Sequence, residues 1–125
     1  MNSTIDRALP LVGRILIAAI FVLSGASKLA DPTSSMAYIA SVGLPLPAVA
    51  LAGAIVVELV GGLLLIAGYR LRLVAAALAL FSLVTAVVFH HALSDQSQFI
   101  NFFKNVAMAG GLLQIVAFGK TGARA

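Results

Sequence analysis

Four long apolar stretches, separated by short polar segments, dominate the pattern of the chain. They cover residues 9–29, 48–67, 73–90 and 100–118. Each is close to the ~20 residues that an α-helix needs to cross a hydrocarbon layer about 30 Å thick. The pattern therefore predicts an all-α fold: a four-helix transmembrane bundle that forms a single domain over residues 1–125.

The composition favours a membrane protein and excludes a small soluble domain. Of the 125 residues, 62% are hydrophobic and 10% are charged, and the mean hydropathy is +1.11. One small soluble core cannot bury that much apolar surface, so the lipid bilayer is the expected partner. Cysteine is absent, which excludes a thiol nucleophile, a disulfide relay or a thiolate metal site carried by this chain alone.

The basic residues predict how the bundle is oriented in the membrane. Six of the eight lie on one side of the four predicted helices: Arg7, Arg14, Arg70, Arg72, Lys120 and Arg124. The positive-inside rule places that side in the cytoplasm, so both termini are expected inside (N-in/C-in). The net charge of +4 then reports topology rather than a nucleic-acid partner, and no basic groove with interleaved aromatic residues accompanies it.

The two connections on the opposite, outer side differ in length. The first, residues 30–47, contains a semi-apolar segment at 36–40 that is too short to span the bilayer. We expect this segment to form a helical turn over the outer mouth of the bundle. The second connection, residues 92–99, is polar and is expected to cap the fourth helix.

Glu58 is the polar residue that most needs an explanation. It lies in the middle of the second stretch, where a carboxylate costs roughly 2.5–3.5 kcal/mol. Gly61 and Gly62 follow three and four residues later, on the same helix face, and small residues allow helices to pack closely. Glu58 is therefore expected to point into the bundle. At a rise of ~1.5 Å per residue, no basic residue lies at its depth, and its partner stays open.

Candidate partners approach Glu58 from both membrane sides. Helical side chains lean toward the N-terminus of their own helix, so Glu58 leans outward while Lys28 leans inward. Lys28 and Lys104 could thus converge on a polar pocket in the outer half, whereas Arg14 could reach Glu58 from below. The alternatives are that Arg14 is a topology anchor and that both lysines extend to the membrane interface.

Histidines at the outer interface are a further candidate group. Adjacent positions on a helix point about 100° apart, so His90 and His91 are not a chelating pair. The remaining His, Asp and Glu residues lack the spacing of metal ligands, and metal binding is not expected. A single histidine at this position is more often a hydrogen-bonded boundary residue, which is the alternative to a role for His90 in ligand binding.

Several short motifs occur in a fixed order along nearly the whole chain. They are Arg14, Ser24–Leu29, Glu58 with Gly61–Leu64, Gly68–Arg70, Phe89–His90, Phe102–Asn105 and Gly110–Leu112. In this order they resemble the DoxX family of small bacterial membrane proteins. The resemblance implies a four-helix bundle in the bacterial cytoplasmic (inner) membrane. Some members of that family are linked to quinone biology, including a subunit of thiosulfate:quinone oxidoreductase and proteins of quinone and catechol resistance.

The leading hypothesis is that the bundle binds a quinone, as an accessory or catalytic subunit beside an oxidoreductase partner subunit. Glu58 is the candidate catalytic residue because it could exchange protons. The candidate ligand-binding residues are Arg14, Ser24, Lys28, His90, Lys104 and Asn105. Phe21 and Phe103 are expected to pack on the ring of the ligand.

Two other functions fit the same residues. The protein could be a small transporter or export component for an aromatic or anionic molecule, with Glu58 coupling transport to protons. Four short helices are few for alternating access, so this hypothesis requires a homo-oligomer. Alternatively, Glu58 is a structural pin between helices, and the protein is a membrane scaffold for partner enzymes.

Overall fold

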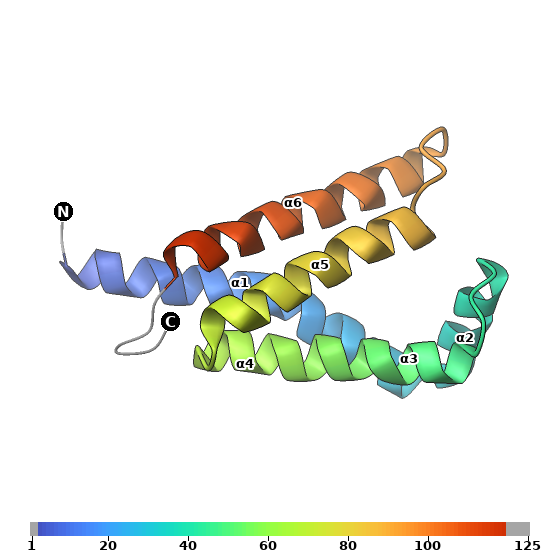
Figure 1. Cartoon of the computed structure of the whole chain (residues 1–125), viewed down its shortest axis with the longest axis horizontal. Coiled ribbons are helices and arrows are strands. Elements are labelled where there is room, and N and C mark those ends of the chain that lie inside the picture. Colours follow the sequence, from blue (N-terminus) through green and yellow to red (C-terminus); the bar gives the residue numbers. More distant parts are fainter. Residues whose placement is uncertain (1–2, 120–125) are drawn as a thin grey trace.

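The computed structural model describes residues 3–119 and is helical over most of that range (Figure 1). In chain order the elements are α1 (Ser3–Ala30), α2 (Pro32–Ser41), α3 (Pro47–Ile55), a π-helical turn (Val56–Val60), α4 (Gly61–Ala67), α5 (Leu71–Phe89) and α6 (Gln96–Phe118). The segment from α3 through the π-helical turn to α4 is one continuous span. Four helices are long and apolar enough to cross a membrane, which confirms the predicted all-α fold with four transmembrane helices.

The start of α1 and the end of α6 lie at the same end of the bundle as the turn between α4 and α5 (Figure 1). Four of the six basic residues in the predicted cytoplasmic set belong to this end, from the first half of α1 and from the α4–α5 turn. The other two, Lys120 and Arg124, lie outside the described residues. Both termini of the described chain therefore approach one membrane face, and which face that is stays a prediction.

The first connection between spans is more ordered than a single helical turn. It forms the ten-residue helix α2, which begins where the side chain of Asp31 accepts a hydrogen bond from the Ser34 N–H (3.2 Å). Pro32 occupies the first helical turn, where its missing N–H has no cost. Asp95 caps α6 in the same way, accepting hydrogen bonds from two backbone N–H groups, as the polar connection predicted.

The helices pack as two pairs. α5 and α6 lie side by side and antiparallel, and α1 packs against the span formed by α3, the π-helical turn and α4 (Figure 1). The two pairs meet around α4, and the buried core there consists of Ala18, Phe21, Leu65, Leu71, Ala75, Leu78, Ala79, Ala109 and Leu112. Toward the α2 end, α3 and α5 diverge, and this divergence leaves room for a site.

Glycines set the distances within the packed part of the bundle. A Cβ atom added at Gly62 would lie 2.8 Å from Val22 Cγ2 on α1, and one added at Gly61 would lie 2.9 Å from Leu78 Cδ2 on α5. This first glycine pair is therefore a packing surface between helices, as predicted. Gly110 on α6 differs, since no described heavy atom lies within 4 Å of a Cβ added there.

We expect Gly62→Ala to destabilise the bundle and Gly110→Ala to leave it unchanged or slightly more stable. Overpacking a tight contact costs about 1–3 kcal/mol, whereas alanine in an open helical position gains up to about 1 kcal/mol over glycine. Thermal unfolding of the two variants in the same detergent measures the difference. Equal stability of the two variants would contradict the close contact between α1 and α4.

Candidate functional site

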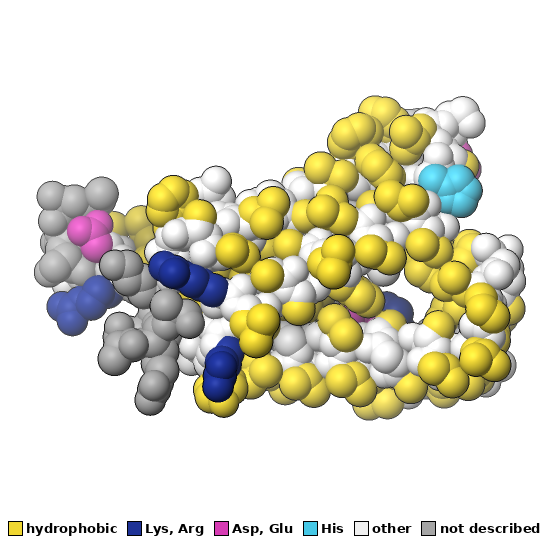
Figure 2. Space-filling model, viewed as in Figure 1, with side chains coloured by type: hydrophobic (Ala, Val, Ile, Leu, Met, Phe, Trp, Pro, Cys, Tyr) yellow, Lys and Arg dark blue, Asp and Glu magenta, His cyan; other side chains and the backbone are white. Residues whose placement is uncertain are grey.

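A cavity of about 830 Å³ lies between the two helix pairs at the α2 end of the bundle. Figure 2 shows it as a hollow between α3 and α5, with acidic and basic atoms visible inside. Its volume is typical of sites for small organic ligands. Six of the seven predicted site residues line the cavity: Ser24, Lys28, Glu58, His90, Lys104 and Asn105.

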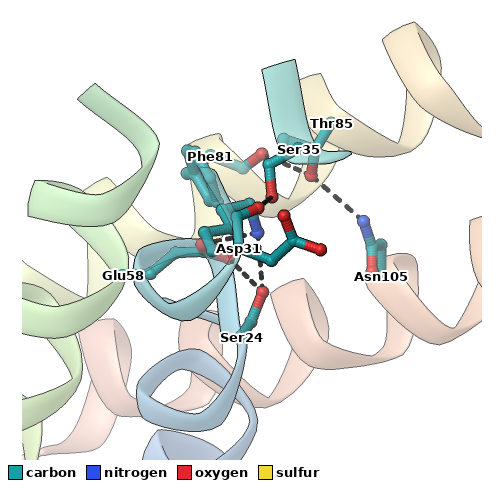
Figure 3. A network of polar contacts seen from close by, with 8 residues as sticks. Ser24, Asp31, Ser35, Glu58, Phe81, Thr85 and Asn105 are labelled. Carbon is teal, nitrogen blue, oxygen red and sulfur yellow. Dashed lines mark hydrogen bonds and ion pairs between the residues drawn. The ribbon is translucent and has the colours of Figure 1, made fainter. Parts of the chain in front are cut away.

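Glu58 forms a closed triangle of polar contacts with two residues of α1. Its Oε1 lies 2.8 Å from Lys28 Nζ, and its Oε2 accepts a hydrogen bond of 2.9 Å from the Ser24 hydroxyl. Lys28 Nζ donates in turn to Ser24 Oγ at 2.8 Å. Ser24 and Lys28 are four residues apart and so share one face of α1. Figure 3 shows Ser24 and Glu58 pointing toward each other from the two helices.

The triangle is asymmetric in its exposure. The Glu58 side chain is 7% exposed, whereas that of Lys28 is 28% exposed. Glu58 is thus enclosed by protein, as the sequence predicts, while Lys28 keeps part of its surface on the cavity. A carboxylate at this depth is tolerable because an opposite charge and a hydroxyl donor replace the water that it has lost.

The pairing of Glu58 with Lys28 corrects the depth argument from the sequence, which found no cation level with Glu58. A Cβ atom added at Gly25 would lie 2.7 Å from Leu59 Cγ and 3.3 Å from Glu58 Cβ, so Glu58 is level with Gly25. The end of α1 at Ala30 is five residues from this level, whereas the start of α3 at Pro47 is eleven residues from it. α1 therefore ends closer to Glu58 along the bundle than α3 begins, and α2 follows the end of α1. The long Lys28 side chain then reaches the carboxylate within one helical turn.

The backbone at Glu58 is also unusual. Glu58 is the central residue of the π-helical turn Val56–Val60. Turns of this kind insert an extra residue into an α-helix, are rare, and occur frequently at functional sites. The extra residue changes the direction of the side chains that follow, so α-helical spacing alone could not have placed this part of the span.

A second polar group lies on the opposite wall, between α5 and α6. The Asn105 side-chain amide donates to Thr85 Oγ1 at 3.1 Å and to the Ser82 carbonyl oxygen at 3.3 Å. Thr85 also donates back to the Phe81 carbonyl oxygen at 2.9 Å. Asn105 and Thr85 point toward each other across the two helices (Figure 3), and this contact holds the Asn105 amide at the cavity wall.

Two basic groups, His90 and Lys104, line the outer part of the cavity. The pKa of His90 is lowered below its ordinary value of 6.5, first because burial disfavours the charged imidazolium and second because Lys104 is a like charge. At neutral pH the imidazole is therefore uncharged and offers one donor and one acceptor. Within the described residues, Lys104 has no ion-pair partner, in contrast to Lys28.

Comparison with known proteins places this chain in a family. The DoxX family model matches residues 9–91, which is more than half of the chain. The chain belongs to the DoxX family. The matched range runs from within α1 to just after the end of α5, and it includes Ser24, Lys28, Glu58 and His90 of the cavity wall.

The chain is also similar to two proteins of Escherichia coli (strain K12). Inner membrane protein YphA is 33% identical over 114 residues, which cover 87% of this chain and 81% of YphA. Inner membrane protein YqjF is 32% identical over 112 residues, which cover 87% of this chain and 82% of YqjF. No solved structure matches the chain. With four helices able to span a membrane, this DoxX protein is a multi-pass protein of the bacterial inner membrane, as predicted.

Arg14 is the predicted site residue that lies away from the cavity wall of this DoxX protein. Its guanidinium donates to the carbonyl oxygens of Leu65 (2.9 Å) and Ile66 (3.2 Å) in the last turn of α4. These carbonyls lack partners within their own helix because α4 ends at Ala67. Arg14 therefore joins α1 to the C-terminal end of α4, and of the two alternatives for this residue the one in which it reaches Glu58 from below is wrong.

The aromatic residues are arranged differently from the sequence prediction. Phe21 lines the cavity as expected, but Phe103 is 48% exposed and packs against its neighbours Phe99 and Phe102 on α6. Phe81 of α5 lines the cavity instead. The side chain four residues before Thr85 falls on the same helix face, and this spacing is the signal that could have identified Phe81.

The outer end of the cavity is covered by residues that the sequence analysis left unassigned. Tyr38 of α2 stacks on Phe89, the last residue of α5, with ring centroids 5.3 Å apart. Both rings line the cavity, together with Ile39 of α2. Because the contact joins segments about fifty positions apart in the chain, no local pattern could have predicted it.

Proposed function

We propose that this DoxX protein binds a quinone, or a similar redox-active lipid-like molecule, as an accessory or catalytic subunit of a membrane oxidoreductase. The observation that carries the proposal is the buried Glu58 with its Lys28 and Ser24 contacts on the wall of an 830 Å³ cavity. Ionisable groups at hydrocarbon depth are costly and commonly serve function. The kinship with quinone-linked members of the family supports the choice of ligand.

The polar groups of the cavity suit the two ring oxygens of a quinone. Lys28 and Lys104 carry donors that can face a carbonyl oxygen, and the neutral His90 can donate or accept. Glu58 would exchange protons with the ligand through the Ser24 hydroxyl or the Lys28 ammonium, both of which it contacts. The electrons would come from a partner subunit.

The orientation of the bundle belongs to the same proposal. With the Arg14 and Arg70 end in the cytoplasm, by the positive-inside rule, the cavity lies in the outer half of the membrane. A quinone site in that half would be reached from the outer leaflet. A homo-oligomer and proton-coupled transport stay as predictions from the sequence.

The scaffold hypothesis is the alternative that one specific contact favours. The Glu58–Lys28 ion pair joins α1 to the π-helical turn, which is what a structural pin between helices would do. Under that hypothesis the pair contributes stability and the cavity has no ligand. The two functions differ in whether a small molecule changes the stability of the folded protein.

Thermal shift with menaquinone and ubiquinone analogues tests the proposed function. A ligand that binds only the folded state stabilises it by about 2.7 kcal/mol at a concentration a hundred times its Kd. We expect the wild-type protein in detergent to gain stability, and Glu58→Gln and Lys104→Met to lose most of that gain. Lys104→Met gives the clearer result of the two, because Lys104 is exposed and has no ion pair within the described residues. We therefore expect this variant to fold as the wild-type protein does.

The control for this measurement is Arg72→Met. Arg72 lies at the other end of the bundle, where it donates to the Gly119 carbonyl oxygen, and it does not line the cavity. This variant should keep the full quinone-dependent gain. A well-folded wild-type protein that shows no gain with either quinone would contradict the proposed function and favour the scaffold.

A further inference from the structure

The cavity is open on the side between α3 and α5, where some of its lining residues are also exposed on the surface of the bundle. Gly53 of α3 and Val84 of α5 both line the cavity and are both exposed, Val84 at 51%. A Cβ atom added at Gly53 would find no described heavy atom within 4 Å. Figure 2 shows the hollow on this face, bordered by hydrophobic side chains. We call this gap, between Gly53 and Val84, the lateral opening.

The lateral opening lies within the membrane-spanning part of the bundle. Gly53 comes six residues after Pro47, the start of its span, and Val84 comes five residues before Phe89, the end of its span. At ~1.5 Å per residue these positions lie about 9 Å and about 7–8 Å below the ends of their helices. Each rim therefore lies within its own membrane-spanning helix, more than one turn from the outer end of that helix.

The lateral opening and the interior of the cavity differ in chemistry. On the α3 side its wall is made of Ala50, Gly53, Ala54 and Val57, and on the α5 side Val84 and Val88 contribute. These residues carry no polar side chain. Further inside lie the ion pair between Glu58, on the π-helical turn that follows α3, and Lys28 of α1, and the amide of Asn105 on α6. A molecule that satisfies both regions has a polar head and an apolar tail.

At the outer end, the route from water is partly covered. α2 lies over this end of the cavity, and the stacked rings of Tyr38 and Phe89 join it to α5. Among the described residues no ring stack joins α3 to α5, and these two helices diverge there (Figure 1). The bilayer side is therefore the more accessible side for an apolar molecule.

We propose that the ligand of this site is a tailed, membrane-dissolved molecule that enters laterally from the bilayer, with its polar ring inside the cavity and its apolar tail leaving between Gly53 and Val84. This inference rests on the proposed quinone function and specifies the kind of quinone: one with a long isoprenoid tail. Small side chains at the rim fit this proposal, because the tail must pass between α3 and α5. Bulk added at either rim should obstruct the tail without touching the polar contacts.

Gly53→Phe and Val84→Trp test the lateral opening from its two sides. Binding of a long-tailed quinone and of a tail-less analogue of the same ring is measured in lipid nanodiscs with each purified variant. We expect the long-tailed quinone to bind at least about tenfold more weakly to both variants than to wild type. The tail-less ring should bind all three proteins within about twofold, because the polar groups of the cavity are unchanged.

Gly110→Phe is the matched control for Gly53→Phe. It adds the same ring to an open glycine position on a spanning helix, but Gly110 does not line the cavity. Its affinity for both quinones should equal that of wild type. Thermal unfolding of each variant without ligand shows that the fold is retained, and for Gly53→Phe the open space around this position favours that result.

The outcomes separate the lateral opening from the proposed function. Unchanged binding of the long-tailed quinone to folded Gly53→Phe and Val84→Trp would overturn the lateral opening and leave the quinone site in place. Equal weakening of the tail-less ring would also overturn it, since bulk at the rim would then act on the interior. If neither quinone binds to wild type, the proposed function fails, and the inference that rests on it fails too.

Discussion

Lys28→Met is expected to lower the free energy of unfolding by about 3–5 kcal/mol, because it leaves a buried carboxylate without its counter-charge. The Glu58 side chain is 7% exposed, and Lys28 and Ser24 supply its polar contacts within the described residues. Methionine keeps most of the volume and the flexibility of the lysine stem. Chemical or thermal unfolding of the purified protein in detergent, followed by circular dichroism, measures the loss.

The double variant Lys28→Met with Glu58→Gln is the control for charge as opposed to packing. Removing both charges together should restore much of the lost stability, since neutral groups of similar shape avoid the desolvation of an isolated ion. Glu58→Gln alone is expected to be milder than Lys28→Met. The reason is that Lys28 is 28% exposed to the cavity and keeps its hydrogen bond to Ser24.

The two single variants and the double variant also distinguish between the proposed functions. If Lys28→Met and Glu58→Gln both leave the stability close to that of wild type, the ion pair contributes little to the fold, and the pin on which the scaffold hypothesis depends is contradicted. If the double variant is stable but binds no quinone, the charges serve the ligand. Stability and binding measured on the same variants thus distinguish the two functions that share these residues.

Arg14→Met is expected to lower the free energy of unfolding by about 2–4 kcal/mol. Hydrogen bonds from a charged donor contribute about 1.5–3 kcal/mol each, and they are not additive when they share one side chain. The variant leaves the Leu65 and Ile66 carbonyl oxygens at the end of α4 without these donors. Arg14 is 8% exposed and Leu65 is fully buried, so little water can reach these carbonyl oxygens to replace the lost donors. The same unfolding measurement applies.

Two further variants sharpen the result for Arg14. Arg14→Lys should fall between wild type and Arg14→Met, because a single ammonium cannot match the planar fork of a guanidinium on two carbonyls. Arg72→Met removes an exposed hydrogen bond to Gly119 of 3.1 Å and should change stability by less than about 1 kcal/mol. A loss as large for Arg72→Met as for Arg14→Met would show that burial of the guanidinium is not the cause.

Ligand binding should be independent of Arg14. This residue is buried at the opposite end of the bundle from the cavity and does not line it. Quinone binding by folded Arg14→Met is therefore expected to match wild type, in contrast to Glu58→Gln. From the sequence, Arg14 is grouped with the ligand-binding residues because any cation near a buried acid is a candidate partner. Only the packing of α1 on α4 shows that Arg14 contacts backbone carbonyl oxygens instead of Glu58.

The amino-acid sequence by itself determined the class of the fold. Four apolar stretches of spanning length allow only helices that satisfy their own backbone hydrogen bonds in lipid, so the number of spans followed directly. Local chemistry also determined the helix starts at Asp31 and Asp95, where an aspartate side chain takes up free N–H groups. The sequence also identified Glu58 as buried, since a charge in a spanning helix must face protein.

The tertiary structure alone decided which of these residues meet. Lys28 pairs with Glu58 because α1 ends short of the start of α3, and Arg14 binds carbonyl oxygens because α4 ends beside it. The π-helical turn at Glu58 and the outward position of Phe103 likewise depend on how whole helices tilt and pack. Depth counted along one helix says nothing of the offset between helices, and a side chain finds its partner only after that offset is set.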